Sequence, residues 1–183
     1  MKFAAPLFLL VSVALFAEQP VFNKDGQLQR PASVREWIYL SSGLGMQYSA
    51  NEGQGPKTFT NVFAEPTAYR EFLKTGKWPE GTMLGMEVRK SQTEGSINKG
   101  GNFQTDLIAL EVTVKDSKRF PQDGWDYFAF NGIAQTTKAI GQQAGCNACH
   151  NKNAAVENTF VQFYPTLIEV ARAKGTFKKS VEQ

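Results

Sequence analysis

Both cysteines and the only histidine of the chain lie within five residues, in the order Cys146-Asn147-Ala148-Cys149-His150. On one turn of a helix, two thiols three residues apart face the same side, and each can add to one vinyl group of a haem. The histidine that follows can then direct an imidazole nitrogen at the iron. The spacing therefore predicts one covalently bound haem c, attached through Cys146 and Cys149, with His150 as the axial ligand of the iron.

Three other interpretations of this motif are open: a structural zinc site, a redox pair of cysteines and a chance occurrence. A structural zinc site needs four ligands, and the chain has no cysteine or histidine beyond these three. A redox pair normally accompanies a βαβ pattern, which the sequence does not show. Covalent haem is therefore the interpretation that the sequence favours.

The chain offers few candidates for the second axial position of the iron. No second histidine exists, and the four methionines, Met1, Met46, Met83 and Met86, all precede the motif. Small electron-transfer cytochromes usually fill this position with His or Met, and their Met usually follows the motif. We therefore expect five-coordinate iron, held by His150 alone, with one side open to a small ligand. An electron carrier with Met86 as sixth ligand is the alternative.

Hydrophobic periodicity predicts the elements that position this motif. Four segments have the composition of β-strands, and in most of them apolar residues alternate at a period of two. These are Thr58–Ala64, Thr82–Arg89, Phe103–Lys115 and Trp125–Phe130. Pro66 begins a helix that ends at Gly76, because Pro is tolerated in the first helical turn and Gly is favoured after the last. The pattern predicts an α+β fold, in which an antiparallel sheet packs with helices and the haem motif lies on a C-terminal helix.

The remaining segments are less regular. Residues Pro31–Trp37 fit a short helical turn, and Gly43, Gly45 and the stretch Asn51–Pro56 are rich in turn-forming residues and predict a mobile loop. Gly95–Gly101 is long enough to join the two middle strands as an antiparallel hairpin. Helical spacing is expected from Gly132 to Ala144 and again over Thr159–Ala173.

Composition limits the classes of protein that the chain can belong to. Its 183 residues include 20 Lys and Arg against 17 Asp and Glu, which gives a formal net charge of +3. This balance excludes a disordered acidic or basic tail and offers no basic excess that would favour nucleic acid as a partner. Hydrophobic residues make up 42% of the chain, which is enough to bury the core of one domain.

The N-terminus has the pattern of a secretory signal peptide. A positive residue precedes an apolar run from Phe3 to Phe16, which is short for a bilayer span and is followed by polar sequence. Cleavage after Ala14 or after Ala17 fits the pattern, and a retained membrane anchor is the alternative. We expect residues 1–17 to be the signal peptide and residues 18–183 to be one haem c domain, exported to the periplasm of a bacterium.

Several stretches, spread over nearly the whole predicted mature chain, are together similar to the cytochrome P-460 superfamily. They are Arg35-Glu36-Trp37, the Pro66 helix with Lys74-Thr75-Gly76, Gly81-Thr82 at the start of a strand, the run from Leu110 to Phe120, the motif from Cys146 to His150, and Phe163-Tyr164-Pro165. The resemblance implies an antiparallel sheet with helices, a periplasmic five-coordinate haem c and a homodimer.

The superfamily has two functional branches, which differ at one strand position. In the P-460 branch a lysine at this position is cross-linked to the haem macrocycle, and the proteins oxidise hydroxylamine. In the cytochrome c′-beta branch the cross-link is absent, and the haem binds gases such as nitric oxide. Counting from Gly81-Thr82, the matching residue is Met86, which has no amine, whereas Lys90 and Lys99 are out of register. The resemblance therefore implies the c′-beta branch. The alternative interpretation of Met86 is an ordinary core methionine that fills a gap in the packing.

Glu111 is the candidate catalytic residue. It lies on the weaker face of the strand Phe103–Lys115, where periodicity alone favours a solvated carboxylate. The resemblance implies instead that the carboxylate faces the distal side of the haem, where an apolar pocket would raise its pKa and let it relay protons. Such a group would support a peroxidase-like reaction with hydrogen peroxide, and a redox partner fits this interpretation. Five aromatic residues could line the pocket, although each is also typical of an ordinary core: Trp37, Phe59, Phe63, Trp125 and Phe128.

Haem attachment can be tested by removing the two thiols. Replacing Cys146 or Cys149 by Ser should leave one thioether bond, and replacing both should leave a haem that acid acetone extracts. The absorbance of the two phases after extraction gives the result. Haem that stays with the protein of the double variant would show that attachment through these thiols is wrong.

Overall fold

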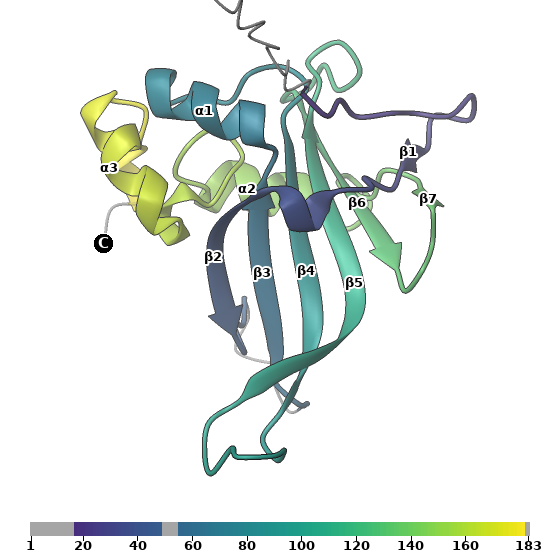
Figure 1. Ribbon diagram of the computed structural model, residues 1–183. Helices are drawn as coiled ribbons and strands as arrows, with labels where there is room; N and C mark the ends of the chain where they lie inside the picture. Colours follow the sequence, from purple (N-terminus) through teal and green to yellow (C-terminus); the bar gives the residue numbers. More distant parts are fainter. Residues whose placement is uncertain (1–16, 49–54, 182–183) are drawn as a thin grey trace, which may run out of the picture.

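A five-stranded antiparallel sheet forms the centre of the computed structural model, which describes residues 17–48 and 55–181. Its strands follow one another in space as in the sequence (Figure 1). They are β2 (Ile38–Leu44), β3 (Thr58–Ala64), β4 (Met83–Gln92), β5 (Phe103–Lys115) and β6 (Trp125–Asn131). Two short strands, β1 (Leu28–Gln29) and β7 (Thr136–Thr137), pair separately.

The helices of the described residues are short. The α-helices are α1 (Pro66–Thr75), α2 (Cys146–Asn153) and α3 (Pro165–Ala173), and the 3-10 helices are η1 (Val34–Glu36), η2 (Val161–Phe163) and η3 (Lys179–Val181). The combination of an antiparallel sheet with helices confirms the predicted α+β class. The predicted haem motif begins α2, and α3 follows it in the chain.

Residues next to helix α1 in the sequence determine where it begins and ends. The Glu65 carboxylate accepts hydrogen bonds from the backbone N–H groups of Thr67 and Ala68, both at 2.8 Å, and Pro66 occupies the first turn. Gly76 ends the helix in the left-handed conformation at φ 71°, which glycine adopts without strain. The predicted helix is thereby confirmed.

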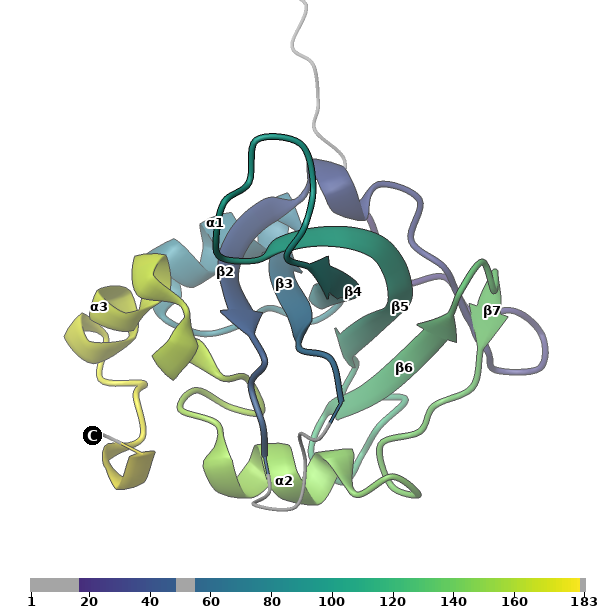
Figure 2. The same cartoon turned by 90° about the horizontal axis from the view of Figure 1, so that it is seen from below.

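The two faces of the sheet are covered differently. On the back face, Phe63 and Val112 pack with Trp37 of the N-terminal segment. On the opposite face, which we call the cavity face, Leu84 belongs to a core with α1 and α3 that includes Phe72. Figure 2 shows that the sheet curves and that α2 lies on its concave side, apart from α1 and α3. Part of the cavity face is therefore left facing α2.

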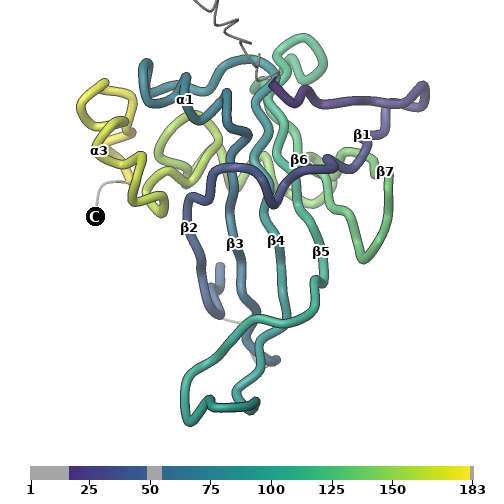
Figure 3. Tube along the Cα trace, in the orientation of Figure 1, coloured from purple at the N-terminus to yellow at the C-terminus, as the bar shows by residue number. Residues whose placement is uncertain are grey.

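The predicted strand Phe103–Lys115 agrees residue for residue with β5, and the expected antiparallel hairpin with β4 is confirmed. The hairpin extends beyond the ends of the other strands (Figure 3). Ile108, expected on the apolar face, is 40% exposed and lies at a register shift between β4 and β5, where Val88 pairs with Ala109 and Arg89 with Leu107.

Three segments differ from the prediction: one strand was missed, one helical segment is wrong and one helix begins later than expected. Strand β2 was not expected, because Ser41, Ser42 and Gly43 interrupt its apolar pattern, and it forms through pairing with β3. Residues 132–144 are not helical, since β7 pairs with β1 and the Ile140 N–H bonds to the Tyr127 carbonyl. The helix expected from Thr159 begins only at Pro165. In each case tertiary pairing overrides local spacing.

The predicted signal peptide lies almost wholly in residues 1–16, outside the described residues. Among the described helices, none has the length and apolar character needed to cross a membrane.

Candidate functional site

A cavity of about 300 Å³ lies between α2 and the cavity face of the sheet. Its walls include all five residues that the sequence singled out for chemistry: Met86, Glu111, Cys146, Cys149 and His150. Two of them come from neighbouring strands and three from α2. The fold therefore brings together residues that are up to 64 positions apart in the chain.

Helix α2 is held at this cavity by the carboxylate of Asp123. The side-chain amides of Asn147 and Asn151 each donate to its Oδ2 at 2.9 Å, and the Trp125 N–H donates to its Oδ1 at 3.0 Å. Burial alone would raise the pKa of Asp123, but these hydrogen bonds outweigh it and hold the pKa below its usual range. The anionic carboxylate therefore fastens two successive turns of α2 to the start of β6.

Gly141 allows the chain before α2 to pass close to the side chains of Asn147 and Asp126. A Cβ at Gly141 would overlap the side-chain oxygens of Asn147 and Asp126. The Gly141 N–H donates to Asp126 Oδ1 at 3.0 Å, which fixes the approach. A larger residue here would displace α2 from the sheet.

The donor set on α2 fits haem attachment better than the other interpretations of the motif. Cys146 and Cys149 are free thiols that both line the cavity. Burial raises the pKa of Cys146, and the charge of Glu111 adds to this effect, whereas a redox cysteine needs a lowered pKa. No group of three or more side chains of His, Cys, Asp or Glu that could hold a metal ion occurs among the described residues.

One hydrogen bond decides which ring nitrogen of His150 carries the proton. Its Nδ1 lies 2.8 Å from the backbone oxygen of Asn158, and a carbonyl oxygen can only accept, so Nδ1 carries the proton. Nε2 is then left with its lone pair, as an iron ligand requires. The rings of Tyr127 and Phe160 pack on the imidazole with centroids 4.3 and 4.4 Å away. Burial lowers the pKa of His150 despite the hydrogen bond, which favours the neutral, ligating form.

Met86 and Glu111 face the cavity from the sheet. They are direct partners in the antiparallel register of β4 and β5, so their side chains stand next to each other on the cavity face. Glu111 is an exposed residue that lines the cavity, and partial desolvation there raises its pKa. The carboxylate thus lines the cavity and is at the same time exposed, as periodicity predicted, and its catalytic role stays a prediction.

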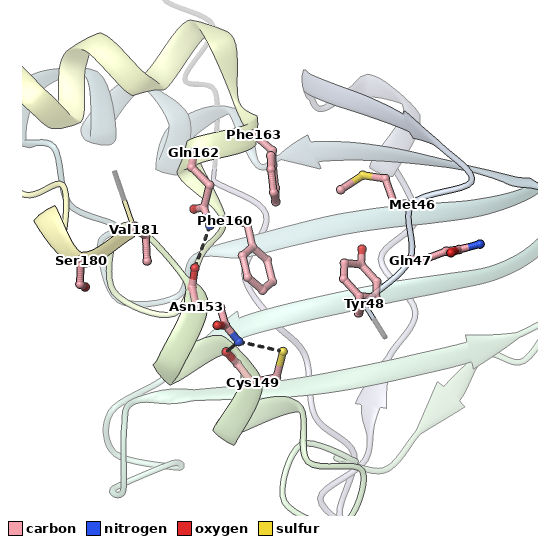
Figure 4. A pocket seen from close by; sticks show the side chains of 10 residues that line it. All are labelled: Met46, Gln47, Tyr48, Cys149, Asn153, Phe160, Gln162, Phe163, Ser180 and Val181. Carbon is pink, nitrogen blue, oxygen red and sulfur yellow. Dashed lines mark hydrogen bonds between the residues drawn. The ribbon is translucent and has the colours of Figure 1, made fainter. Parts of the chain in front are cut away.

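A second cavity of about 470 Å³ adjoins the first and shares Tyr48, Cys149 and Phe160 with it. Figure 4 shows Asn153 beside Cys149, where its amide donates to the Cys149 carbonyl oxygen at 3.0 Å and lies 3.5 Å from the sulfur. The Cys149 side of the site is therefore more open than the Cys146 side.

Of the five aromatic residues suggested for the pocket wall, one lines the cavity. Phe128 borders the cavity, while Trp37, Phe63 and Trp125 are buried in the core and Phe59 is half-buried on β3. The two alternative amines do not line the cavity: Lys90 pairs with Asp106, and Lys99 is exposed in the hairpin.

Sequence reasoning missed four residues that shape the site, namely Asp123, Tyr127, Asn158 and Phe160. Each acts through a tertiary contact with α2 or His150. No spacing within their own segments signals these contacts.

A comparison with known families decides which family this arrangement belongs to. The model of the Cytochrome P460 family matches residues 31–161, which include the cavity face and the whole Cys-x-x-Cys-His motif. The chain belongs to the cytochrome P460 family. The comparison with curated proteins found no match. Membership in this family implies a haem cofactor, and the neutral imidazole and two free thiols at one cavity fit that group.

Asp123 should be needed to keep α2 in place. Asp123→Ala removes the acceptor of three hydrogen bonds and should lower the free energy of unfolding by about 2 kcal/mol. It should also lower the haem content per chain, because the two thiols and His150 lose their shared support. Denaturant unfolding and a haemochrome assay measure the two effects, with the exposed Asp25→Ala as control. Equal stability and haem content in both variants would contradict this role.

Proposed function

We propose that this cytochrome P460 family protein is a periplasmic mono-haem c protein that binds small ligands such as nitric oxide and hydrogen peroxide. The observation that carries the proposal is the composition of the cavity. One side offers a neutral imidazole with a free Nε2, and the sheet side offers a thioether and a carboxylate. A haem c held there would supply an iron with His150 as its axial ligand and one coordination position for a small molecule.

Met86 supports assignment to the cytochrome c′-beta branch. The family resemblance puts the cross-linking lysine of the P-460 branch at this position, and no lysine is among the residues that line the cavity. Met86 lies next to Glu111 on the cavity face, where it supplies an apolar, flexible wall. The haem is therefore proposed to be attached only through the two cysteines.

Glu111 is proposed to move protons for a bound ligand. Its ionised carboxylate can accept a proton from hydrogen peroxide held in the cavity, and its acid form can return that proton to the far oxygen, which would leave as water. A bound haem would supply the two electrons for breaking the O–O bond. The chain has one histidine, which is assigned to the iron, so the carboxylate takes the place of a distal imidazole. This gives the protein a peroxidase-like activity.

Two alternatives have specific support. Hydroxylamine oxidation is a known activity of the P-460 branch of this family, and Glu111 could serve as its proton acceptor. Electron transfer with Met86 as the sixth ligand is favoured by the position of its thioether on the opposite side of the cavity from α2. We also propose export to the periplasm, a homodimer and a redox partner, on the signal-like N-terminus and the family resemblance.

Met86→Lys should test the branch assignment. The variant places an amine beside Glu111 at the position of the P-460 lysine, and a cross-link should form, with peroxide as the oxidant. A red-shifted ferrous spectrum and an altered intact mass would reveal it. Val88→Lys, two residues along the same strand and outside the cavity, is the matched control. A cross-linked mass in the wild type would refute the assignment.

Glu111→Gln should slow the reaction with peroxide by about 10²-fold, since general acid–base catalysis contributes about that much or more. The reaction needs the ionised carboxylate, so the rate of the wild type should fall when acid protonates Glu111. Because the pKa of Glu111 is raised, this fall should occur at a higher pH than for an ordinary carboxyl group. The variant should lack this dependence. Stopped-flow mixing of ferric protein with peroxide measures both, and Asp106→Asn on the same strand is the control. Equal rates at every pH would leave Glu111 without a catalytic role.

A further inference from the structure

A tight turn presents the carbonyl group that bonds to His150. Val156 and Thr159 exchange backbone hydrogen bonds of 2.9 and 3.3 Å across this turn. Its first central residue, Glu157, has a φ of 50°, in the left-handed region. Glycine is the favoured residue where a two-residue turn needs a positive φ, because a side chain is strained there. A glutamate at this position calls for a reason outside the turn.

The carboxylate of Glu157 supplies that reason. Lys115 Nζ, at the end of β5, donates to both of its oxygens at 2.9 and 3.0 Å and also to the Trp78 carbonyl at 2.7 Å. Both side chains of this pair are largely buried, so water screens the contact less than on an open surface. The side chain of Glu157 is therefore tied to the sheet at a fixed point.

A second lysine holds the backbone of the same turn. Lys178 Nζ donates to the carbonyl oxygens of Glu157 and Asn151, both at 3.2 Å. Asn151 belongs to α2, so this ammonium group links the turn to the helix that carries His150. The turn is thus held through its side chain by β5 and through its main chain by α2.

The turn aims one acceptor at the imidazole. The Asn158 oxygen accepts from His150 Nδ1 at 2.8 Å, and the Tyr127 hydroxyl lies 3.5 Å from the same oxygen. We propose that Glu157, anchored by Lys115, is a positioning residue for His150, which fixes the Asn158 carbonyl on Nδ1 and so sets the electron donation of the imidazole. The inference rests on the proposed function, because it takes His150 as the iron ligand.

Loss of this anchor has a defined electronic consequence. A firm acceptor on Nδ1–H makes Nε2 a stronger donor, which favours ferric over ferrous iron. A looser turn should weaken the donor and favour the ferrous state. Removing an outer-shell partner of a ligating histidine changes affinity or activity 10–100-fold, and Glu157 acts one step further out. We therefore expect a smaller effect than this 10–100-fold range: the ferrous-to-ferric ratio at a fixed ambient potential should rise about threefold in a variant that lacks the anchor.

Three variants of the purified holoprotein test this role. Glu157→Gly removes the carboxylate and introduces a residue that tolerates a positive φ. Glu157→Gln keeps the shape of the side chain and removes its charge. Lys115→Met removes the ammonium group that binds the carboxylate. Each should raise the reduction potential and lower the iron–imidazole stretching frequency in the ferrous resonance Raman spectrum. Glu169→Gln, which disturbs an exposed ion pair with Arg172 on α3, is the control and should change neither.

The outcomes separate the two proposals. If Glu157 only shaped the turn, Glu157→Gly would relieve strain, keep or raise the stability and leave the frequency and the potential unchanged, and the inference would be overturned. A wild-type protein without an iron–imidazole band would refute a five-coordinate iron and with it the proposed function, whereas unchanged reduction potentials in the three variants would overturn the inference alone. Lower frequencies in all three variants, with Glu157→Gly as stable as the wild type, would establish the positioning role.

Discussion

The carboxylate of Asp123 fixes the helix on which the rest of the site depends. Helix α2 has eight residues, no side-chain hydrogen bond at its N-cap, and Asn147 as its buried side chain. An isolated helix of this length is unstable in water, and α2 has no apolar stripe with which to bind the sheet. Polar contacts therefore supply much of its attachment, and Asp123 provides two of them through Asn147 and Asn151. The same contacts place both thiols and His150 at one cavity.

Strand β5 organises both sides of this cavity. Glu111 stands on its cavity face beside Met86, and Lys115 at its end reaches the turn that presents the Asn158 carbonyl to His150. One rigid strand thus carries the proposed proton-transfer group and the anchor of the proposed axial ligand. Because β4 and β6 hydrogen-bond to β5 on both sides, the backbone that carries both groups is fixed within the sheet.

The sequence alone was enough to predict the elements whose signals are local. Alternation over Phe103–Lys115 predicted β5, and Pro66 and Gly76 predicted the ends of α1. The Cys-x-x-Cys-His spacing identified Cys146, Cys149 and His150 because their chemistry lies within one helical turn. In contrast, β2 forms by pairing with β3 across a stretch of Ser and Gly, which local pattern does not predict.

The position of Glu111 illustrates a second limit. A period of two tells which residues of a strand share a face, but the covering elements decide which face is buried and what lies opposite. Here α2 arrives from 35 residues further along the chain and turns the weaker face of β5 into the wall of a cavity. Asp123, Tyr127 and Asn158 escaped prediction for the same reason, since their roles exist only once α2 has docked.

The absorption spectrum of the purified protein in the ferrous state tests the central claim most directly. That claim is a haem c bound through two cysteines, with His150 as its axial ligand and Met86 as an unlinked neighbour. It predicts an ordinary high-spin c-type spectrum. A band displaced far to the red, as a cross-linked macrocycle gives, would contradict it, and so would a sharp low-spin spectrum, which would mean a second protein ligand on the iron.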